Sequence, residues 1–299
     1  MINYKIAAIV VTYNRKELLK KCINAILNQS FLPSIIYIID NASTDGTDSL
    51  FESKQNISPL INYIRLIENG GGAQGFYHGL KTAHETNAYD AYWVMDDDGQ
   101  PDKYCLENLI KYLPQYDYLA PLVLDIDNKN QLAFNYKGSF ILKDLEKKVT
   151  NNIIEDWACP FNGILYSKKL IEKIGYPKKE MFIWGDEANY HLRAKDSGSL
   201  PYMIMNALHF HPKEKTLLYK SITRDVIYIE NKLKTYCFHR NIIYNNKMRW
   251  KFKDHISHIC NYFYYILIKK MNISLFCTFL KACIAGYCNK FDGHKKYLK

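Results

Sequence analysis

Three consecutive carboxylates, Asp96, Asp97 and Asp98, directly follow an apolar run and precede a glycine. In an extended chain, alternation places Asp96 and Asp98 on one face and Asp97 on the other. Carboxylates held this close repel each other unless one is protonated or a cation lies between them. Hard oxygen ligands of this kind suit Mg²⁺ or Mn²⁺, which also take oxygens from phosphate-bearing substrates. The alternative is a solvated acidic loop, and the apolar lead-in argues against it.

The elements that would position these acids are buried strands. Continuous apolar runs, typical of parallel strands buried on both faces, occur at residues 6–11, 35–39 and 92–95, and residues 61–67 are expected to form a further strand. Helical periodicity at residues 15–29, and a second helix expected to end near Ala88, alternate with these strands. We therefore expect an α/β fold with a doubly wound, mostly parallel sheet, whose ligands bind at the carboxyl ends of the strands.

The second half of the chain has a different pattern of expected strands and helices. We expect strands at residues 118–124 and 202–210, a hairpin at residues 134–142 and a helix that begins near Asp186. From Lys220 onward the pattern is helical and rich in aromatic residues and lysine. The apolar runs of this tail are interrupted by lysines, so each is too short to span a bilayer.

The charged residues are distributed unevenly along the chain. The net charge is +10, yet residues 212–299 hold 18 lysines and arginines against 5 acidic residues. This asymmetry predicts a boundary near Pro212, with one domain at residues 1–212 and a basic, helical appendage at residues 213–299. Such a tail suits the acidic headgroups at the inner face of the cytoplasmic membrane, and nucleic acid is the alternative partner. No RNP, zinc or helix-turn-helix signature supports the nucleic-acid interpretation.

Three further features narrow the class of protein. The eight cysteines include no CxxC pair, which argues against a zinc ribbon and a disulfide framework. The first residues resemble a short strand rather than a signal peptide, so we expect a cytoplasmic protein. The glycine run at residues 70–72 is not a GxGxxG motif and lacks the lysine and serine of a P-loop, which argues against dinucleotide and ATP binding.

Taken in order, the motifs resemble the family-2 inverting glycosyltransferases of the GT-A fold. The segments that carry this resemblance are VTYNR (11–15), DNASTDGT (40–47), NGGGAQGF (69–76), DDD (96–98) and WGDE (184–187). The resemblance covers roughly residues 5–212, and the glycine-rich segment with the DDD triplet is most similar to the galactofuranosyltransferase branch. The segment YCFHRN (236–241) is similar to a YYxxRN element that follows the catalytic domain in many of these enzymes, and an ordinary helix face is the alternative.

The resemblance implies a set of residues that hold a UDP-sugar. Uracil and ribose would be held by the turn containing Thr12, Tyr13 and Arg15 and by Asp40, with Arg15 also suited to the diphosphate. Asn69, Gly71 and Gly72 would let the backbone approach the donor sugar or phosphate closely. Asp97 would contact the donor sugar or the ribose.

The resemblance also implies which residues bind the metal ion and which residue is the catalytic base. Asp96 and Asp98 would hold Mn²⁺ or Mg²⁺, and His211 would complete the metal shell, with His209 as the competing histidine. Asp186 would take the proton of the acceptor hydroxyl. Trp184 and Glu187 would bind the acceptor, although the order Trp-Gly-Asp-Glu departs from the WDD form of galactofuranosyltransferases by one position.

The activity implied is the transfer of galactofuranose from UDP-galactofuranose to a lipid-linked saccharide during surface polysaccharide assembly. The protein would be peripheral to the membrane, and its oligomeric state is open. A rhamnosyltransferase that uses dTDP-rhamnose is the alternative within the enzyme class. From another class, the alternatives are a non-catalytic nucleotide- or glycan-binding module and a nucleic-acid-binding protein.

Overall fold

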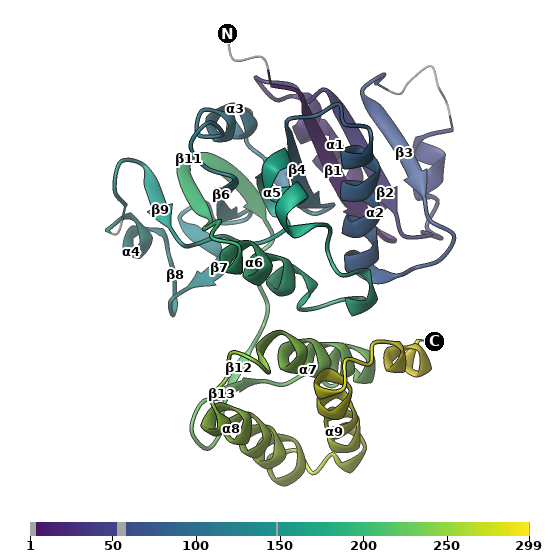
Figure 1. Ribbon diagram of the computed structural model, residues 1–299, viewed down its shortest axis with the longest axis vertical. Helices are drawn as coiled ribbons and strands as arrows, with labels where there is room; N and C mark the ends of the chain where they lie inside the picture. The colour runs from purple at the N-terminus through teal and green to yellow at the C-terminus, as the bar shows by residue number, and fades with distance from the viewer. Residues whose placement is uncertain (1–3, 53–57, 148, 299) are drawn as a thin grey trace. The chain divides into compact units, whose positions relative to one another are not determined.

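The computed structural model describes residues 4–52, 58–147 and 149–298 (Figure 1). The chain forms two compact units. The first unit contains the chain up to Lys179 together with Tyr190–Glu214, and the second contains Glu180–Asn189 and the chain from Lys215 on. The charge pattern predicted a boundary near Pro212, close to the division after Glu214. The segment with Trp184, Asp186 and Glu187, expected in the first domain, lies in the second unit.

Parallel strands make up the amino-terminal half of the sheet in the first unit. They are β1 (Ile6–Thr12), β2 (Ile35–Asp40), β3 (Ile61–Arg65) and β4 (Ala91–Asp96), in the spatial order β3-β2-β1-β4. The predicted apolar runs thus form strands, because β1 and most of β4 are buried on both faces. The register pairs Thr12 with Asp40 and Val11 with Asp96, so three strands end at the same edge.

The sheet continues through an antiparallel strand. β10 (Asn162–Ser167) lies between β4 and β6 (Tyr118–Asp125), and β11 (Tyr202–His211) runs parallel to β6. Because two reversals restore the direction, β6 and β11 point the same way as β4, and His211 ends its strand at the edge where Asp96 ends β4. The shorter strands are β5 (Gln100–Pro101), β7 (Gln131–Tyr136), β8 (Ser139–Ile141) and β9 (Ile153–Glu155). The pair β7 and β8 confirms the predicted hairpin.

Helices cover both faces of this sheet (Figure 1). They are α1 (Lys16–Leu27), α2 (Gly71–Glu85), α3 (Cys105–Ile110), α4 (Leu142–Glu146), α5 (Lys168–Ile174) and α6 (Asp186–Asp196), with short 3₁₀ helices at Thr47–Leu50 and Lys179–Met181. Alternation along β1 divides the core: Ile9 faces α2, whereas Ala8 faces α1 and α3. The sheet is therefore buried on both sides, as the continuous apolar runs predicted.

The second unit is mostly helical. It contains a two-stranded sheet of β12 (Leu218–Lys220) and β13 (Asp225–Ile227), followed by α7 (Lys232–Asn246), α8 (Phe252–Phe263), a π-helical segment (Tyr264–Lys269), α9 (Ile273–Tyr287) and a 3₁₀ helix (Asp292–Tyr297). The prediction of a helical pattern from Lys220 onward was wrong for the strand β13. In the described part of the chain, no helix combines the length and apolar character that crossing a membrane requires.

Close packing of α7 on α9 depends on a glycine. A Cβ on Gly286 would lie 2.6 Å from the Arg240 carbonyl oxygen and 2.8 Å from Ile243 Cβ, so a larger residue would push the helices apart. Around this contact the unit has its own apolar core, centred on Ile243, Tyr262 and Phe279. All eight cysteines are free thiols, in accord with the absence of a disulfide framework in the sequence.

Candidate active site

The acidic turn begins where β4 ends. Asp96 is the last residue of the strand, and the Gly99 amide donates a 3.3 Å hydrogen bond to the Asp96 carbonyl oxygen. Asp97 and Asp98 therefore lie in a turn, and the alternation expected for an extended chain does not extend to them. The carboxylates of Asp97 and Asp98 instead converge on the same guanidinium group, that of Arg15.

Arg15 joins the turn after β1 to the turn after β4. Its Nη1 donates to Asp97 Oδ1 at 3.1 Å and to Asp98 Oδ2 at 2.8 Å. Half of the Arg15 side chain remains exposed to solvent. Burial lowers the pKa of Arg15, but the charges of Asp97 and Asp98 outweigh burial and hold the pKa above its usual value. The predicted role of Arg15 at a diphosphate is compatible with this position.

Asp97 is buried, with 2 % of its surface exposed. Its Oδ2 accepts a 2.7 Å hydrogen bond from the Thr12 hydroxyl. Burial raises the pKa of Asp97 to about 6, although the charge of Arg15 and the hydrogen bond from Thr12 lower it. In this structure the Thr12 side chain, predicted to bind the donor, supports the acidic turn, whereas its neighbour Tyr13 is exposed.

His211 lies against Asp98, with 3.1 Å between Nε2 and Asp98 Oδ1. Its Nδ1 lies 2.6 Å from the Pro212 carbonyl oxygen, to which a proton on Nδ1 would be donated. Burial raises the pKa of Asp98, but the hydrogen bond and charge of His211 outweigh burial and hold the pKa below its usual value. Of the two competing histidines, the structure therefore places His211 beside an acid of the triplet.

His209 is fully buried beneath the acidic turn. Among the described residues, neither of its ring nitrogens has a hydrogen-bond partner. Burial lowers its pKa to about 3, so the ring is neutral at physiological pH. Glycines make room for it: a Cβ on Gly99 would overlap the ring, and one on Gly163 would lie 2.7 Å from Nδ1. His209 thus acts as packing under Gly99, one residue beyond Asp98.

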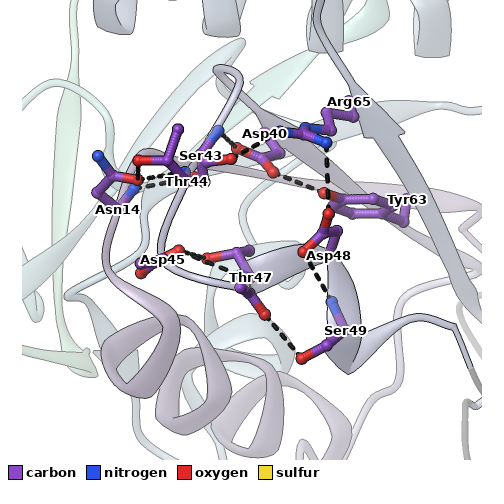
Figure 2. Close-up of polar contacts among 11 residues, drawn as sticks. Asn14, Asp40, Ser43, Thr44, Asp45, Thr47, Asp48, Ser49, Tyr63 and Arg65 are labelled. Carbon is purple, nitrogen blue, oxygen red and sulfur yellow. Dashed lines mark hydrogen bonds and ion pairs between the residues drawn. The ribbon is translucent and has the colours of Figure 1, made fainter.

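A second polar network joins the turns after β1 and β2 (Figure 2). Asp40 is fully buried, and its carboxylate accepts hydrogen bonds from the Ser43 amide at 2.8 Å and the Tyr63 hydroxyl at 2.6 Å. Ser43 Oγ accepts from the Asn14 amide at 2.9 Å, and Asn14 Oδ1 accepts from the Thr44 amide at 2.7 Å. Asp40, predicted to bind base or ribose, fixes the shape of this loop through both of its carboxylate oxygens.

The same loop is held from two other directions (Figure 2). Arg65, at the end of β3, donates to the Ser43 carbonyl oxygen at 2.7 Å and forms a 3.3 Å ion pair with Asp48. Asp45 accepts from the Thr47 hydroxyl at 2.6 Å and, with its other oxygen, from the Lys16 amide at 3.0 Å. Asp45 thus ties the first residue of the 3₁₀ helix at Thr47–Leu50 to the start of α1.

The glycine-rich segment forms the start of α2. Asn69 Oδ1 accepts a 2.8 Å hydrogen bond from the Gly71 amide, and Gly71 has a positive φ of 74°. A Cβ on Gly75 would overlap Val11 and lie 2.9 Å from Asn41 Nδ2, so this glycine brings α2 close to the ends of β1 and β2. Among the described residues, nothing lies within 4 Å of a Cβ placed on Gly72. The first turn of α2 is therefore at the edge where Asp96 ends β4, with an open position at Gly72.

The predicted base lies in the second unit, at the first residue of α6. Asp186 is buried, with 4 % exposed, and comes after a loop with positive φ at Phe182 (66°), Trp184 (61°) and Gly185 (105°). Glu187 Oε2 accepts a 2.9 Å hydrogen bond from the Gly185 amide. This residue, which is predicted to bind the acceptor, therefore also contacts the backbone of the loop. The Trp184 ring contacts Phe238 edge-on, with 5.8 Å between ring centroids.

Within the described residues, no group of three or more His, Cys, Asp or Glu side chains is arranged as a metal site. The pair Asp98 and His211 nevertheless fits a divalent ion in part. If Nδ1 carries the proton toward the Pro212 carbonyl oxygen, Nε2 is left facing the Asp98 carboxylate. This pair supplies one oxygen and one nitrogen donor, and further oxygens would have to come from a substrate or from Asp96.

Parallel strands whose polar carboxyl ends gather at one edge of a sheet covered by helices are typical of the GT-A fold class. The chain belongs to glycosyl transferase family 2, whose family model matches residues 7–175. The protein is thus a glycosyltransferase.

Two similar proteins support the assignment to the glycosyltransferases. The chain is 30 % identical over 213 residues to the galactofuranosyltransferase GlfT1 of Mycobacterium tuberculosis, a match that covers 69 % of each protein. It is 25 % identical over 185 residues to a Campylobacter jejuni enzyme, GalNAc(5)-diNAcBac-PP-undecaprenol beta-1,3-glucosyltransferase, covering 62 % of this chain and 57 % of that one. Both names describe the transfer of a sugar, in agreement with the family to which this chain belongs.

The solved structures agree on the fold. A Pyrobaculum calidifontis mannosyltransferase, determined in complex with GDP-Man and Mn²⁺, has a TM-score of 0.57 at 16 % identity, and the match covers 96 % of this chain and 76 % of that one. At this identity the likeness establishes the arrangement of helices and strands. The predicted α/β class and GT-A fold are thereby confirmed.

Sequence reasoning missed two groups of residues. The first is the support of the Asp40 loop by Tyr63 and Arg65, which are ordinary strand residues in the sequence. The second is the set of polar side chains on α7 that contact the loop before Asp186. The YCFHRN segment contains two of them, Arg240 and Asn241, for which the sequence indicated only a family motif or an ordinary helix face.

Proposed function

We propose that the protein transfers galactofuranose from UDP-galactofuranose to a lipid-linked saccharide, with inversion at the anomeric carbon and with the help of a divalent cation. The observation that carries this proposal is the cluster of Arg15, Asp97, Asp98 and His211 at one edge of the sheet. The name of the mycobacterial relative supports the donor sugar, and the undecaprenol-linked substrate in the name of the Campylobacter enzyme supports the acceptor class.

The donor would occupy the edge formed by the turns after β1, β2 and β4. Arg15 is half exposed and would bind the diphosphate with the part of its guanidinium that does not face Asp97 and Asp98. The first backbone amides of α2 and the open position at Gly72 would accommodate phosphate or sugar. Tyr13 is exposed and would stack on the uracil ring, while the buried Asp40 would keep the loop in shape.

Asp98 and His211, with Asp96, would hold Mn²⁺ or Mg²⁺. When bound, the ion would stabilise the negative charge of the departing UDP without a proton transfer. Arg15 would add positive charge beside Asp98, and the hydrogen bond from Thr12 would keep Asp97 in place.

Asp186 would take the proton from the acceptor hydroxyl as that hydroxyl attacks the anomeric carbon. One carboxylate is enough for an inverting transfer, unlike the paired acids of glycosidases. Glu187 and Trp184 would bind the acceptor, in addition to the contacts they make within the loop.

The second unit would attach the enzyme to the membrane surface. Exposed apolar residues recur at helical spacing on α8 (Phe252, Ile256, Phe263) and α9 (Ile273, Leu280, Ile284), and Lys251, Lys253 and Lys281 are exposed on or beside the same helices. Apolar residues with adjacent lysines suit a surface of anionic headgroups. The full chain should sediment with anionic vesicles but not with zwitterionic ones, and Ile284→Glu should weaken the binding. Equal sedimentation of this variant would contradict the attachment.

A screen of nucleotide-sugars tests the donor. Purified protein with Mn²⁺ should release UDP from UDP-galactofuranose faster than from other UDP-sugars, and this readout requires no knowledge of the acceptor. Preferential release of dTDP from dTDP-rhamnose would favour the rhamnosyltransferase alternative instead. Membership of an enzyme family argues against a purely binding function.

A further inference from the structure

Helix α7 directs three polar side chains at the backbone of the loop that precedes Asp186. Arg240 Nη2 donates to the Met181 carbonyl oxygen at 2.6 Å. Asn241 Nδ2 lies within hydrogen-bond distance of three carbonyl oxygens, those of Met181 (3.1 Å), Ile183 (3.0 Å) and Trp184 (2.8 Å). Asn245 Nδ2 donates to the Gly185 carbonyl oxygen at 2.8 Å. Nearly every carbonyl group of this loop therefore has a partner on one helix.

The loop has a conformation that its sequence alone does not favour. Phe182 and Trp184 have positive φ, an uncommon state for residues with large side chains. Such strained positions persist only where the surrounding structure determines them. Gly185 is required for the approach itself, because a Cβ at this position would lie 2.9 Å from Asn241 Cβ. The hydrogen bonds from α7 provide the external constraint.

The side chains that make these bonds are themselves fixed. Arg240 is fully buried, and its Nε donates to Asn241 Oδ1 at 2.9 Å, which orients the Asn241 amide with its NH₂ group toward the loop. Arg240 Nη1 also donates to the Phe291 carbonyl oxygen at 2.8 Å. A buried guanidinium bound to backbone carbonyl oxygens is held in one geometry by every bond it makes.

Asn245 contacts the chain on both sides of Asp186. Its Nδ2 bonds the Gly185 carbonyl oxygen, one residue before Asp186, and its Oδ1 accepts from Asn189 Nδ2 at 3.0 Å, three residues after it. The buried amide of Asn245 thus attaches the first turn of α6 to α7. Rotation or translation of this turn relative to α7 would break one of the two bonds.

We propose that Arg240, Asn241 and Asn245 are positioning residues that hold Asp186 in the orientation needed to take the acceptor proton. The basic tail then has a role in the chemistry as well as in membrane attachment. This inference rests on the proposed function, because it assumes that Asp186 is the base.

The test uses the full chain, UDP-galactofuranose and octyl galactofuranoside as an acceptor that mimics a lipid-linked saccharide. Asn245→Ala and Asn241→Ala should each lower kcat for acceptor-dependent UDP release by about ten- to a hundredfold. The KM for the donor and the thermal shift produced by UDP should stay within about twofold of the wild type, because the donor site lies on other residues. Asn246→Ala is the matched control, since Asn246 lies on the same helix and its side chain donates to the Ile242 carbonyl oxygen of that helix rather than to the loop.

A double-mutant cycle separates positioning from folding. If Asn245 acts through Asp186, Asn245→Ala should lower kcat in the wild type but have little further effect in an Asp186→Asn background. Wild-type kcat in both Asn245→Ala and Asn241→Ala, with Asp186→Asn inactive, would overturn the positioning role alone. Near-normal kcat in Asp186→Asn would instead overturn the base assignment. Full additivity of the two substitutions would show that Asn245 acts on general stability and would also overturn the proposal.

Discussion

The Thr12 hydroxyl donates a 2.7 Å hydrogen bond to Asp97, although the two residues lie 85 positions apart in the sequence. The bond joins the carboxyl ends of β1 and β4, which are neighbours in the sheet. It is buried, and it connects the first predicted donor-binding motif to the acidic triplet. The edge of the sheet is therefore one polar assembly in which each loop supports the next.

Replacing Thr12 by valine should destabilise the first unit. The substitution leaves Asp97 Oδ2 without its buried donor, which should lower the free energy of unfolding by about 1–3 kcal/mol. Chemical denaturation with tryptophan fluorescence as the readout measures the change. Thr44→Val is the control, since the Thr44 side chain is exposed and its hydroxyl makes a long 3.4 Å contact with Asn14. Equal effects of the two substitutions would contradict a special role for the bond between Thr12 and Asp97.

Replacing Arg15 by glutamine should weaken donor binding. A charge-assisted hydrogen bond contributes about 1.5–3 kcal/mol, so the KM for UDP-galactofuranose should rise by about ten- to a hundredfold. Steady-state UDP release at varied donor concentration measures KM. Lys20→Gln removes an exposed positive charge from the same helix region and should leave KM unchanged. An unchanged KM in Arg15→Gln would exclude the guanidinium from the donor site.

Replacing Gly99 and Gly72 by alanine should have opposite effects on stability. Gly99→Ala would press a methyl group into the buried His209 ring, and such overpacking costs about 1–3 kcal/mol of stability. In Gly72→Ala, the added methyl group has no described atom within 4 Å. Alanine also forms helices better than glycine, so the free energy of unfolding should stay the same or rise. Because Gly72 is an expected donor-binding position, its substitution should instead raise the KM for the donor. Thermal unfolding and donor kinetics of both variants distinguish these effects, and the reverse order of stability would contradict the packing described.

Acid should destabilise the second unit through two buried histidines. Burial lowers the pKa of His258 to about 3, and the charge of Arg224 contributes to this shift; burial also lowers the pKa of His239 well below its usual value. Both groups take up protons on unfolding, where their pKa is about 6.5, so stability should fall as the pH drops below about 6.5. Each histidine contributes a slope of up to about 1.4 kcal/mol per pH unit.

Denaturation between pH 7.5 and 5 measures this slope. His258→Gln should reduce it, whereas replacing His255, a partly exposed histidine of the same helix, should have less effect. A slope that is the same in His258→Gln and in the wild type would show that His258 is not the group that takes up the proton.

The sequence predicts the sheet well because its signals are local. The apolar runs at β1, β2 and β4 can be buried only as central strands, and a polar end to each such strand predicts a site at one edge. The alternation expected for Asp96 and Asp98 failed because β4 ends at Asp96, and the end of a strand is set by tertiary contacts that a local pattern does not contain. Likewise, the role of Asp40 toward a ligand stays a prediction, and the sequence did not reveal that Tyr63 and the Ser43 amide donate hydrogen bonds to its carboxylate.

The conformation of the loop before Asp186 could not be predicted from the sequence. Its conformation depends on Asn241 and Asn245, which lie nearly sixty residues further along the chain and contact backbone atoms that every sequence contains. A contact of this kind has no periodicity and no characteristic residue pair. Motif order predicts Asp186 as the base, but only the structure shows what holds its backbone.

Substitution of Asp186 by asparagine tests the central claim most directly. With UDP-galactofuranose, Mn²⁺ and octyl galactofuranoside, the wild type should release UDP in proportion to the acceptor, and Asp186→Asn should lower kcat by at least about a hundredfold. Protection of the variant by UDP in a thermal shift should remain, because the donor residues are intact. Near-normal turnover by Asp186→Asn, with Asp196→Asn at the other end of α6 as the reference, would contradict the account.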